Sequence, residues 1–159
     1  MAHQRCDRIS KNIKIKTTKY NCFLDELLKM AYFEDLTPHS YSLRRIEDGV
    51  LNIGWLAKGH EFDRGVTPEK FRQNLKKICQ NAIHLHRGFH VCEFCKPSQG
   101  DDCAKGNGQI RICSQNNIWY VAPTMIYHYV IKHNYHPPNE FINAIINPKY
   151  IAKDSKNVK

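Results

Sequence analysis

Apolar residues recur every three or four positions in four stretches of the chain, at residues 21–30, 67–81, 123–133 and 138–146. This spacing places apolar side chains on one face of a helix. The pattern therefore predicts four helices, each with one face turned toward a core. The residues expected to face the core are Phe23, Leu24, Leu27, Leu28, Phe71, Leu75, Ile78, Phe141, Ile142 and Ile145.

Residues at the ends of these stretches predict where the helices begin and end. Asn21 and Thr67 are expected to act as N-caps, because a short polar side chain can accept a hydrogen bond from a free N–H group of the first turn. Pro68 and Pro123 suit a first helical position, where a missing N–H removes no hydrogen bond. Asn134 is expected to cap the C-terminus of the third helix.

Two further regions have the composition of β-strands. Residues 50–56 form a short run rich in β-branched and apolar side chains, which predicts a buried strand. Residues 109–113 and 118–121 flank a polar turn at 114–117, which predicts a β-hairpin. The side chains expected on one face of this hairpin are those of Ile110, Ile112, Trp119 and Val121. Strands and helices together predict an α+β fold.

The positive charge of the chain is concentrated at its two ends. Of the net charge of +9, residues 1–19 contribute six Lys/Arg against one acid, and residues 148–159 contribute four against one. Residues 20–147 contain fourteen Lys/Arg against thirteen acids. We therefore expect a basic N-terminal tail at 1–19, a single domain at 20–147 and a basic C-terminal tail at 148–159. Such tails can attract polyanions or keep a protein soluble.

The cysteines and the N-terminus predict a cytoplasmic protein. Seven cysteines is an odd number, and the polar N-terminus is followed by no secretory apolar region. The longest apolar run, residues 118–131, is interrupted by Pro123 and His128 and is too short to cross a bilayer. In a reducing compartment the thiols are free to bind metal.

The chemistry of the chain is concentrated between residues 92 and 133. Cys92 and Cys95 are separated by two residues, and His128 and His133 lie near the end of the third predicted helix. Two thiolates and two imidazoles can form a closed tetrahedral Zn²⁺ shell that leaves no position for water. The pattern predicts a small α+β domain in which a zinc knuckle, a β-hairpin and a helix close a structural zinc site. Two or three further helices complete this domain.

The identity of the third and fourth ligands is open in the sequence. His128 and His133 lie about 140° apart on an ideal helix, so His133 is expected where the last turn loosens. His90 lies close to the cysteine pair, and two further cysteines would complete an all-cysteine set of four. The alternates are therefore His90, Cys103 and Cys113.

A metal-dependent hydrolase and a nucleic-acid-associated protein are the alternative functions. A zinc deaminase carries His-x-Glu and Pro-Cys-x-x-Cys with one open ligand position, whereas here His60 adjoins Glu61 and Val91 precedes the cysteine pair. We therefore assign no catalytic residue. The predicted helix at 123–134 has only Lys132 to offer to a DNA groove, so weak contact with nucleic acid or another polyanion would fall to the basic tails.

Several motifs, taken in order, resemble a group of small uncharacterised bacterial proteins. The motifs are Gly54-Trp55-Leu56, Arg87-Gly88-Phe89-His90-Val91-Cys92-Glu93-Phe94-Cys95 and Ala122-Pro123-x3-Tyr127-His128-Tyr129-Val130. The resemblance covers roughly residues 20–146 and implies a self-contained unit, but it implies no activity. The zinc prediction therefore rests on the residues and their spacing. The sequence predicts no protein partner and assigns no role to His60, His84 or His86.

Overall fold

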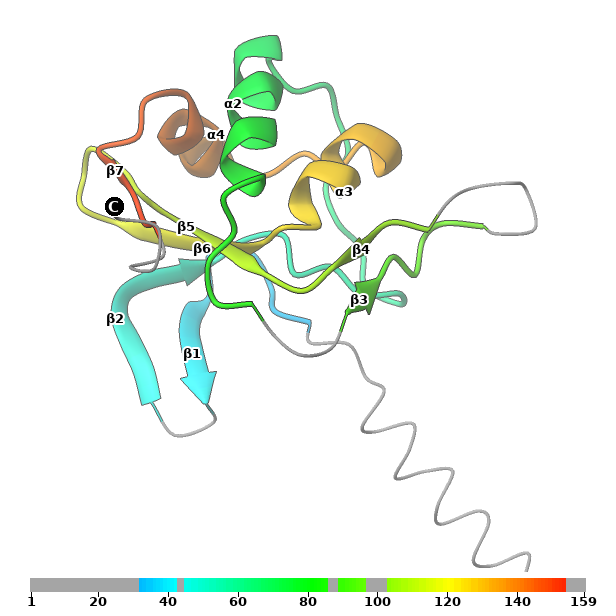
Figure 1. The fold of residues 1–159 in the computed structure, drawn as a ribbon, viewed down its shortest axis with the longest axis horizontal. Helices are drawn as coiled ribbons and strands as arrows, with labels where there is room; N and C mark the ends of the chain where they lie inside the picture. The colour runs from blue at the N-terminus through cyan, green and yellow to red at the C-terminus, as the bar shows by residue number, and fades with distance from the viewer. Residues whose placement is uncertain (1–31, 43–44, 86–88, 97–102, 154–159) are drawn as a thin grey trace, which may run out of the picture. The chain divides into compact units, whose positions relative to one another are not determined.

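The computed structural model describes residues 32–42, 45–85, 89–96 and 103–153, all within the unit Ala31–Lys159 (Figure 1). The predicted helix at 21–30 and the predicted tail at 1–19 lie outside the described residues. In chain order the elements are β1 (Pro38–Ser42), β2 (Arg45–Asn52), α2 (Glu69–Cys79), β3 (His90–Val91), β4 (Lys105–Gly106), β5 (Gln109–Cys113), β6 (Trp119–Pro123), α3 (Ile126–His133), α4 (Asn139–Ile146) and β7 (Tyr150–Ile151).

A mixed sheet and three helices make up the described part of the chain. The sheet has five strands in the order β1-β2-β6-β5-β7, and β3 and β4 form a separate two-stranded sheet. β2 runs parallel to β6, whereas the other neighbouring pairs are antiparallel. Figure 1 shows α2, α3 and α4 together on one side of β5 and β6. The predicted α+β class is confirmed.

The hydrophobic core lies between these helices and one face of the sheet. Ile110 and Ile112 of β5 are buried there with Tyr120 of β6. Phe141 packs edge-on against Tyr120 and Phe71, with ring centroids 5.8 and 6.3 Å apart. The residues predicted to face the core from α2 and α4 are all buried: Phe71, Leu75, Ile78, Phe141, Ile142 and Ile145.

The β5–β6 hairpin forms as predicted, but its register differs by one residue. Ile112 pairs with Tyr120 and Ile110 pairs with Ala122, so the predicted face with Trp119 and Val121 is wrong. The reason is the loop, in which the Ser114 N–H donates to the Ile118 carbonyl at 2.9 Å. Ile118 thus belongs to a five-residue loop instead of the strand. A one-residue change in loop length moves every side chain of a strand to the opposite face.

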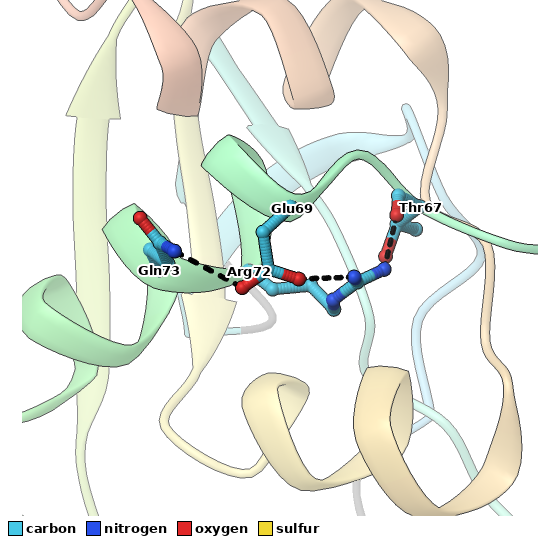
Figure 2. A network of polar contacts seen from close by, with 4 residues as sticks. All are labelled: Thr67, Glu69, Arg72 and Gln73. Carbon is cyan, nitrogen blue, oxygen red and sulfur yellow. Dashed lines mark hydrogen bonds and ion pairs between the residues drawn. The ribbon is translucent and has the colours of Figure 1, made fainter.

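Two predicted helix starts are also wrong. α2 begins at Glu69 with Pro68 in the N-cap position and no side-chain cap, so Thr67 is not the cap. The Arg72 guanidinium instead donates to the Thr67 carbonyl and to the Glu69 carboxylate, as Figure 2 shows. Gln73 Nε2 also donates to Glu69, at 3.1 Å. These side chains tie the first turn of α2 to the segment before it.

The predicted start of α3 is displaced because of strand pairing. Pro123 is the last residue of β6, where it pairs with Gln109 of β5, and α3 begins only at Ile126. The Thr124 N–H donates to the Gly108 carbonyl at 2.9 Å and continues the contact between the two chain segments. Tertiary pairing thus outweighs the preference of proline for a first helical position.

The predicted strand at 50–56 ends early, because the chain turns at Gly54. β2 stops at Asn52, and Gly54 has a positive φ of 69°. Its N–H donates to Asp35 Oδ1 at 2.7 Å, and a Cβ at this position would lie 2.8 Å from Ile126 Cδ1. Glycine is the residue that combines this conformation with this close approach.

The C-terminal part of the chain adds a short edge strand to the sheet. β7 pairs antiparallel with β5 through Ile151 and Tyr150, and it lies within the segment 148–159 that we expected to be a tail. A C-terminally shortened protein must therefore retain Ile151 if the sheet is to stay intact. Of the described helices, none is long and apolar enough to cross a lipid bilayer.

Candidate metal centre

Four side chains with metal-ligand chemistry meet from two separate parts of the chain. Cys92 and Cys95 follow β3, whereas His128 and His133 belong to α3. Their ligand atoms all lie within 4.8 Å of one another. Cys92 Sγ lies 3.2 Å from His133 Nε2, and Cys95 Sγ lies 3.3 Å from His128 Nε2. The two imidazole Nε2 atoms are 3.1 Å apart. This group can hold a metal ion.

Four of the six separations within this group are close to those around a tetrahedral ion. With Zn–S bonds of about 2.3 Å and Zn–N bonds of about 2.0–2.1 Å, ligand atoms at the corners of a tetrahedron lie about 3.3–3.8 Å apart. The three separations above are close to this range, and Cys95 Sγ lies 3.7 Å from His133 Nε2. Two thiolates would also neutralise the charge of one divalent cation.

The small β3–β4 sheet presents the two cysteines to α3. The Cys92 N–H donates to the Ala104 carbonyl at 3.0 Å, so the knuckle, which we define as residues 92–95, begins where the β3–β4 ladder ends. A Cβ on Gly106 of β4 would lie 2.8 Å from Thr124 Oγ1 and 2.9 Å from Met125 Cγ. Glycine at this position therefore lets the β3–β4 sheet approach the start of α3 closely.

The end of α3 brings the two histidines onto the same side of the helix. The Asn134 N–H donates to the Tyr129 carbonyl, five residues earlier, and Asn134 has a left-handed φ of 54°. The Tyr135 N–H donates to the same carbonyl at 3.1 Å, so the helix ends in a wide turn at a left-handed residue. A bond over five residues widens the last turn and reduces the angle between His128 and His133. The predicted loosening and the predicted Asn134 cap are confirmed.

The structure does not bring the three alternate ligands into this group. His90 Nε2 lies 3.0 Å from the Tyr129 hydroxyl and makes a hydrogen bond with it. The buried Cys113 thiol instead donates to the Ser114 carbonyl at 3.5 Å. Among the described residues, the ligand-type side chains that could share an ion are those of the four residues above, and Cys103 is not one of them.

An aromatic side chain from the knuckle covers one side of the centre. Phe94 lies between the two cysteines in sequence, and its ring centroid is 5.5 Å from that of His133 and 5.9 Å from that of Tyr129. Phe62 packs edge-on against Phe94 at 5.4 Å. This apolar layer keeps the polarity around the ligands low, which strengthens ligation. Phe94 had no predicted role, although an aromatic residue between the paired cysteines is visible in the sequence.

The loop before α2 is tied to both halves of the centre. Arg64 Nη1 donates to the His133 carbonyl at 2.9 Å, and its guanidinium lies 4.4 Å above the Phe62 ring. The Lys58 N–H donates to Glu93 Oε2 at 2.7 Å. Arg64 and Glu93 had no predicted role, because residues so distant in sequence give no local signal of contact. His60 lies in this loop and stacks on Tyr32, with ring centroids 3.6 Å apart. His86 lies outside the described residues.

Burial lowers the acidity of two cysteine thiols, those of Cys92 and Cys79. Burial raises the pKa of the Cys92 thiol to about 11, and it raises the pKa of Cys79, which packs at the edge of the core, to about 12. Without a nearby cation, both thiols would stay protonated at neutral pH. Cys79 is therefore an inert core thiol, whereas Cys92 needs a bound cation to become a thiolate.

The fold and the site together define a small α+β protein with a four-residue centre able to hold a metal ion. The chain matches the family model described as Domain of unknown function (DUF7919) over residues 31–146, and it belongs to that family. The match includes all four residues of the centre and agrees with the resemblance to small uncharacterised proteins. Comparison with curated proteins and with solved structures found no match.

Proposed function

We propose that this chain is a zinc-binding protein in which the ion has a structural role. The observation that carries the proposal is the convergence of Cys92, Cys95, His128 and His133, whose ligand atoms lie within 4.8 Å of one another. Cysteine and histidine are the ligands that structural zinc sites use, and four of them complete the tetrahedral shell. The ion would join the knuckle to α3. These two segments are distant in the sequence, with Cys95 and His128 separated by 33 positions.

A structural role is favoured over hydrolysis by the number and surroundings of the ligands. A catalytic zinc keeps one position for water and takes three ligands from the protein. Here four protein ligands are available, enough to fill all four positions of a tetrahedral shell. Phe94 and Tyr129 add an apolar layer beside His133. The described cysteines form no disulfide, which suits a reducing compartment such as the cytoplasm.

Elemental analysis of the purified full-length chain tests this proposal. We expect about one zinc per chain, because a closed four-ligand shell holds one ion. The measurement should follow extensive dialysis, so that loosely bound ions on surface histidines are removed. A fully folded protein that contains no metal after this treatment would contradict the proposal.

Polyanion binding through the basic ends is a second candidate function, supported by the charge distribution. Residues 1–19 carry +5, and residues 154–159 carry two lysines against one acid. Removing both segments should abolish weak, salt-sensitive binding to duplex DNA or heparin. Such binding depends on lysine and arginine side chains, which neutralise the polyanion and release the counterions bound to it. The metal content and the melting curve should stay nearly unchanged, because the truncation keeps β7.

The truncated protein can be measured beside the full-length chain by fluorescence anisotropy over a series of salt concentrations. The full-length chain should show affinity that falls steeply with salt, and the truncated chain should show no binding at moderate salt. If the truncated protein still bound DNA tightly and with sequence preference, a base-reading surface would have to lie within the domain and the tails would not be responsible.

A further inference from the structure

The sheet face opposite the core carries a row of polar residues. Asn52 of β2 and Arg111 of β5 both pair with Val121 of β6, so these three side chains lie side by side on the face that Ile112 does not occupy. His39 of β1 extends the row, because its Nδ1 lies 2.7 Å from Asn52 Oδ1. Figure 1 shows β1 and β2 on the side of β5 and β6 away from the helices. We call His39, Glu47, Asn52, Gln109 and Arg111 the polar cluster.

Three buried nitrogen atoms of the polar cluster have no hydrogen-bond partner among the described residues. They are His39 Nε2, Gln109 Nε2 and Arg111 Nε. His39 is only 4 % exposed and Gln109 only 2 % exposed. A buried polar group without a partner is costly, and such groups are rare in native proteins unless a ligand or ordered water satisfies them. Three in one cluster therefore indicate that something polar binds there.

The hydrogen bonds around Asn52 define what His39 can offer. Asn52 Nδ2 donates to the Pro38 carbonyl at 3.2 Å and to Thr37 Oγ1 at 3.3 Å, so Asn52 Oδ1 is the acceptor. His39 Nδ1 must then carry the hydrogen that Oδ1 accepts. The free Nε2 of His39 is an acceptor in the neutral ring and becomes a donor when the ring is protonated.

Arg111 is held so that only one side of its guanidinium is engaged by protein. Its Nη1 and Nη2 donate to the two carboxylate oxygens of Glu47 at 2.8 and 3.1 Å, which leaves Nε–H directed elsewhere. The Arg111 and Glu47 side chains are 19 % and 30 % exposed, so the cluster opens to solvent at this ion pair. The hydrogen bonds from Arg111, and after them the positive charges of Arg111, His39 and His84, lower the pKa of Glu47.

The segment after α2 forms another side of the cluster. Ile83 and Gln109 exchange backbone hydrogen bonds of 2.8 and 3.0 Å, and His84 follows with a positive φ of 49°. A non-glycine residue in this left-handed region is uncommon, and such residues concentrate at functional sites. The cluster therefore combines side chains from β1, β2 and β5 with the start of the loop that follows Ile83.

We propose that the polar cluster is a binding site for a small carboxylate, in which Gln109 Nε2 and Arg111 Nε each donate a hydrogen bond to it. The two residues are separated by one position on β5, so their side chains leave the same face of the sheet about 7 Å apart. Arg111 can hold Glu47 through Nη1 and Nη2 and an incoming carboxylate through Nε–H at the same time, so its guanidinium supplies the positive charge at the site. The site shares no residue with the metal centre and does not depend on the proposed function.

Side-chain nuclear magnetic resonance of the ¹⁵N-labelled, full-length, zinc-supplemented protein tests this proposal. Sodium acetate is the probe, sodium chloride keeps the ionic strength constant, and acetamide is the neutral compound of matching shape. We expect acetate to shift the Arg111 Nε–H and Gln109 amide signals saturably, with a dissociation constant on the order of millimolar for so small a ligand. A saturable response to acetamide equal to that for acetate, or no saturable response to acetate, would overturn the proposal.

Two variants and one control locate the site. Gln109→Leu removes the amide donor at similar volume, and Arg111→Lys keeps a cation opposite Glu47 without an Nε–H. Each should weaken acetate binding by roughly tenfold or more, as expected for a lost hydrogen bond to a charged ligand. Gln73→Leu, on the exposed side of α2, should bind acetate like the parent. Unchanged affinity in both test variants would overturn the assignment.

The melting temperature of Gln109→Leu provides an independent readout. If the buried amide is kept for a ligand, the ligand-free variant should melt at least as high as the parent, because a leucine removes an unsatisfied polar group from the interior. Acetate should raise the melting temperature of the parent but not that of Gln109→Leu. A large loss of stability in the ligand-free variant would show that the amide serves packing alone and would contradict the proposal.

Discussion

Replacing Cys95 by serine, or His128 by alanine, is expected to lower the melting temperature by roughly 15 °C and to release the zinc. The physical reason is that ligation free energy is also folding free energy, because the unfolded chain has no preformed site. Losing even a part of it, at least about 4 kcal/mol, corresponds to this shift for a domain of this size. Circular dichroism melting curves and zinc content measured on the same samples provide the test.

Two control substitutions separate ligation from general damage. His90→Gln changes a half-buried histidine that contacts Tyr129 and not the centre, and Cys103→Ser changes a cysteine outside the four-residue group. Both controls should retain about one zinc per chain. If Cys95→Ser or His128→Ala were as stable and as zinc-rich as the parent, the substituted residue would not be a ligand.

Removing zinc with a strong chelator is expected to release the knuckle from α3 while the five-stranded sheet stays folded. The core around Phe71, Tyr120 and Phe141 is built from apolar contacts that involve no ligand. Hydrogen exchange should therefore accelerate by about a hundredfold or more at the Cys92 and Asn134 amides. Without the ion, the backbone hydrogen bonds of these two amides would open more often. Cys92 N–H is protected by Ala104 and Asn134 N–H by Tyr129.

Hydrogen exchange followed by mass spectrometry or nuclear magnetic resonance can localise this effect. The amides of Ile112 and Tyr120 in the β5–β6 ladder should keep most of their protection after chelation, and adding zinc back should restore the slow exchange at Cys92. Equal acceleration in the knuckle and in the β5–β6 ladder would show that the ion supports the whole domain. No acceleration at either position would mean that the centre makes no contribution to local stability.

Local periodicity explains why most of the core could be predicted from the sequence. Phe71, Leu75 and Ile78 lie on one face of a helix whatever else the chain does, because their spacing matches the helical repeat. The same is true of Phe141 and Ile145 in α4. For such residues the helical spacing of apolar side chains, read over about a dozen neighbouring positions, is enough to predict burial.

The sheet register and the strand ends could not be predicted, because they depend on distant contacts. The register of β5 and β6 follows from a five-residue loop closed between Ser114 and Ile118, whereas the sequence also allowed a four-residue turn. The parallel pairing of β2 with β6 aligns Val50 with Trp119, and no local pattern indicates which strands become neighbours. Pairing with Gln109 likewise kept Pro123 in a strand.

The four residues that converge in the candidate metal centre could be singled out from the sequence for a chemical reason. A cysteine pair with two residues between its members and a histidine pair at the end of a helix each have few other uses, so their spacing is informative without knowledge of the fold. The contacts of Arg64 with His133 and of Lys58 with Glu93 were not predictable, since they join segments 69 and 35 residues apart. The polar cluster was missed because Gln109 and Arg111 are ordinary strand residues until the opposite strands are placed beside them.

X-ray absorption spectroscopy at the zinc edge tests the central claim most directly, because it reports the atoms bound to the ion in the purified full-length protein. The expected spectrum is that of four-coordinate zinc with two sulfur ligands at about 2.3 Å and two nitrogen ligands at about 2.0–2.1 Å. The Cys95→Ser variant, if it retains any zinc, should show one sulfur ligand fewer. A parent spectrum with an oxygen ligand from water and fewer than two sulfur ligands would contradict a closed site formed by Cys92, Cys95, His128 and His133.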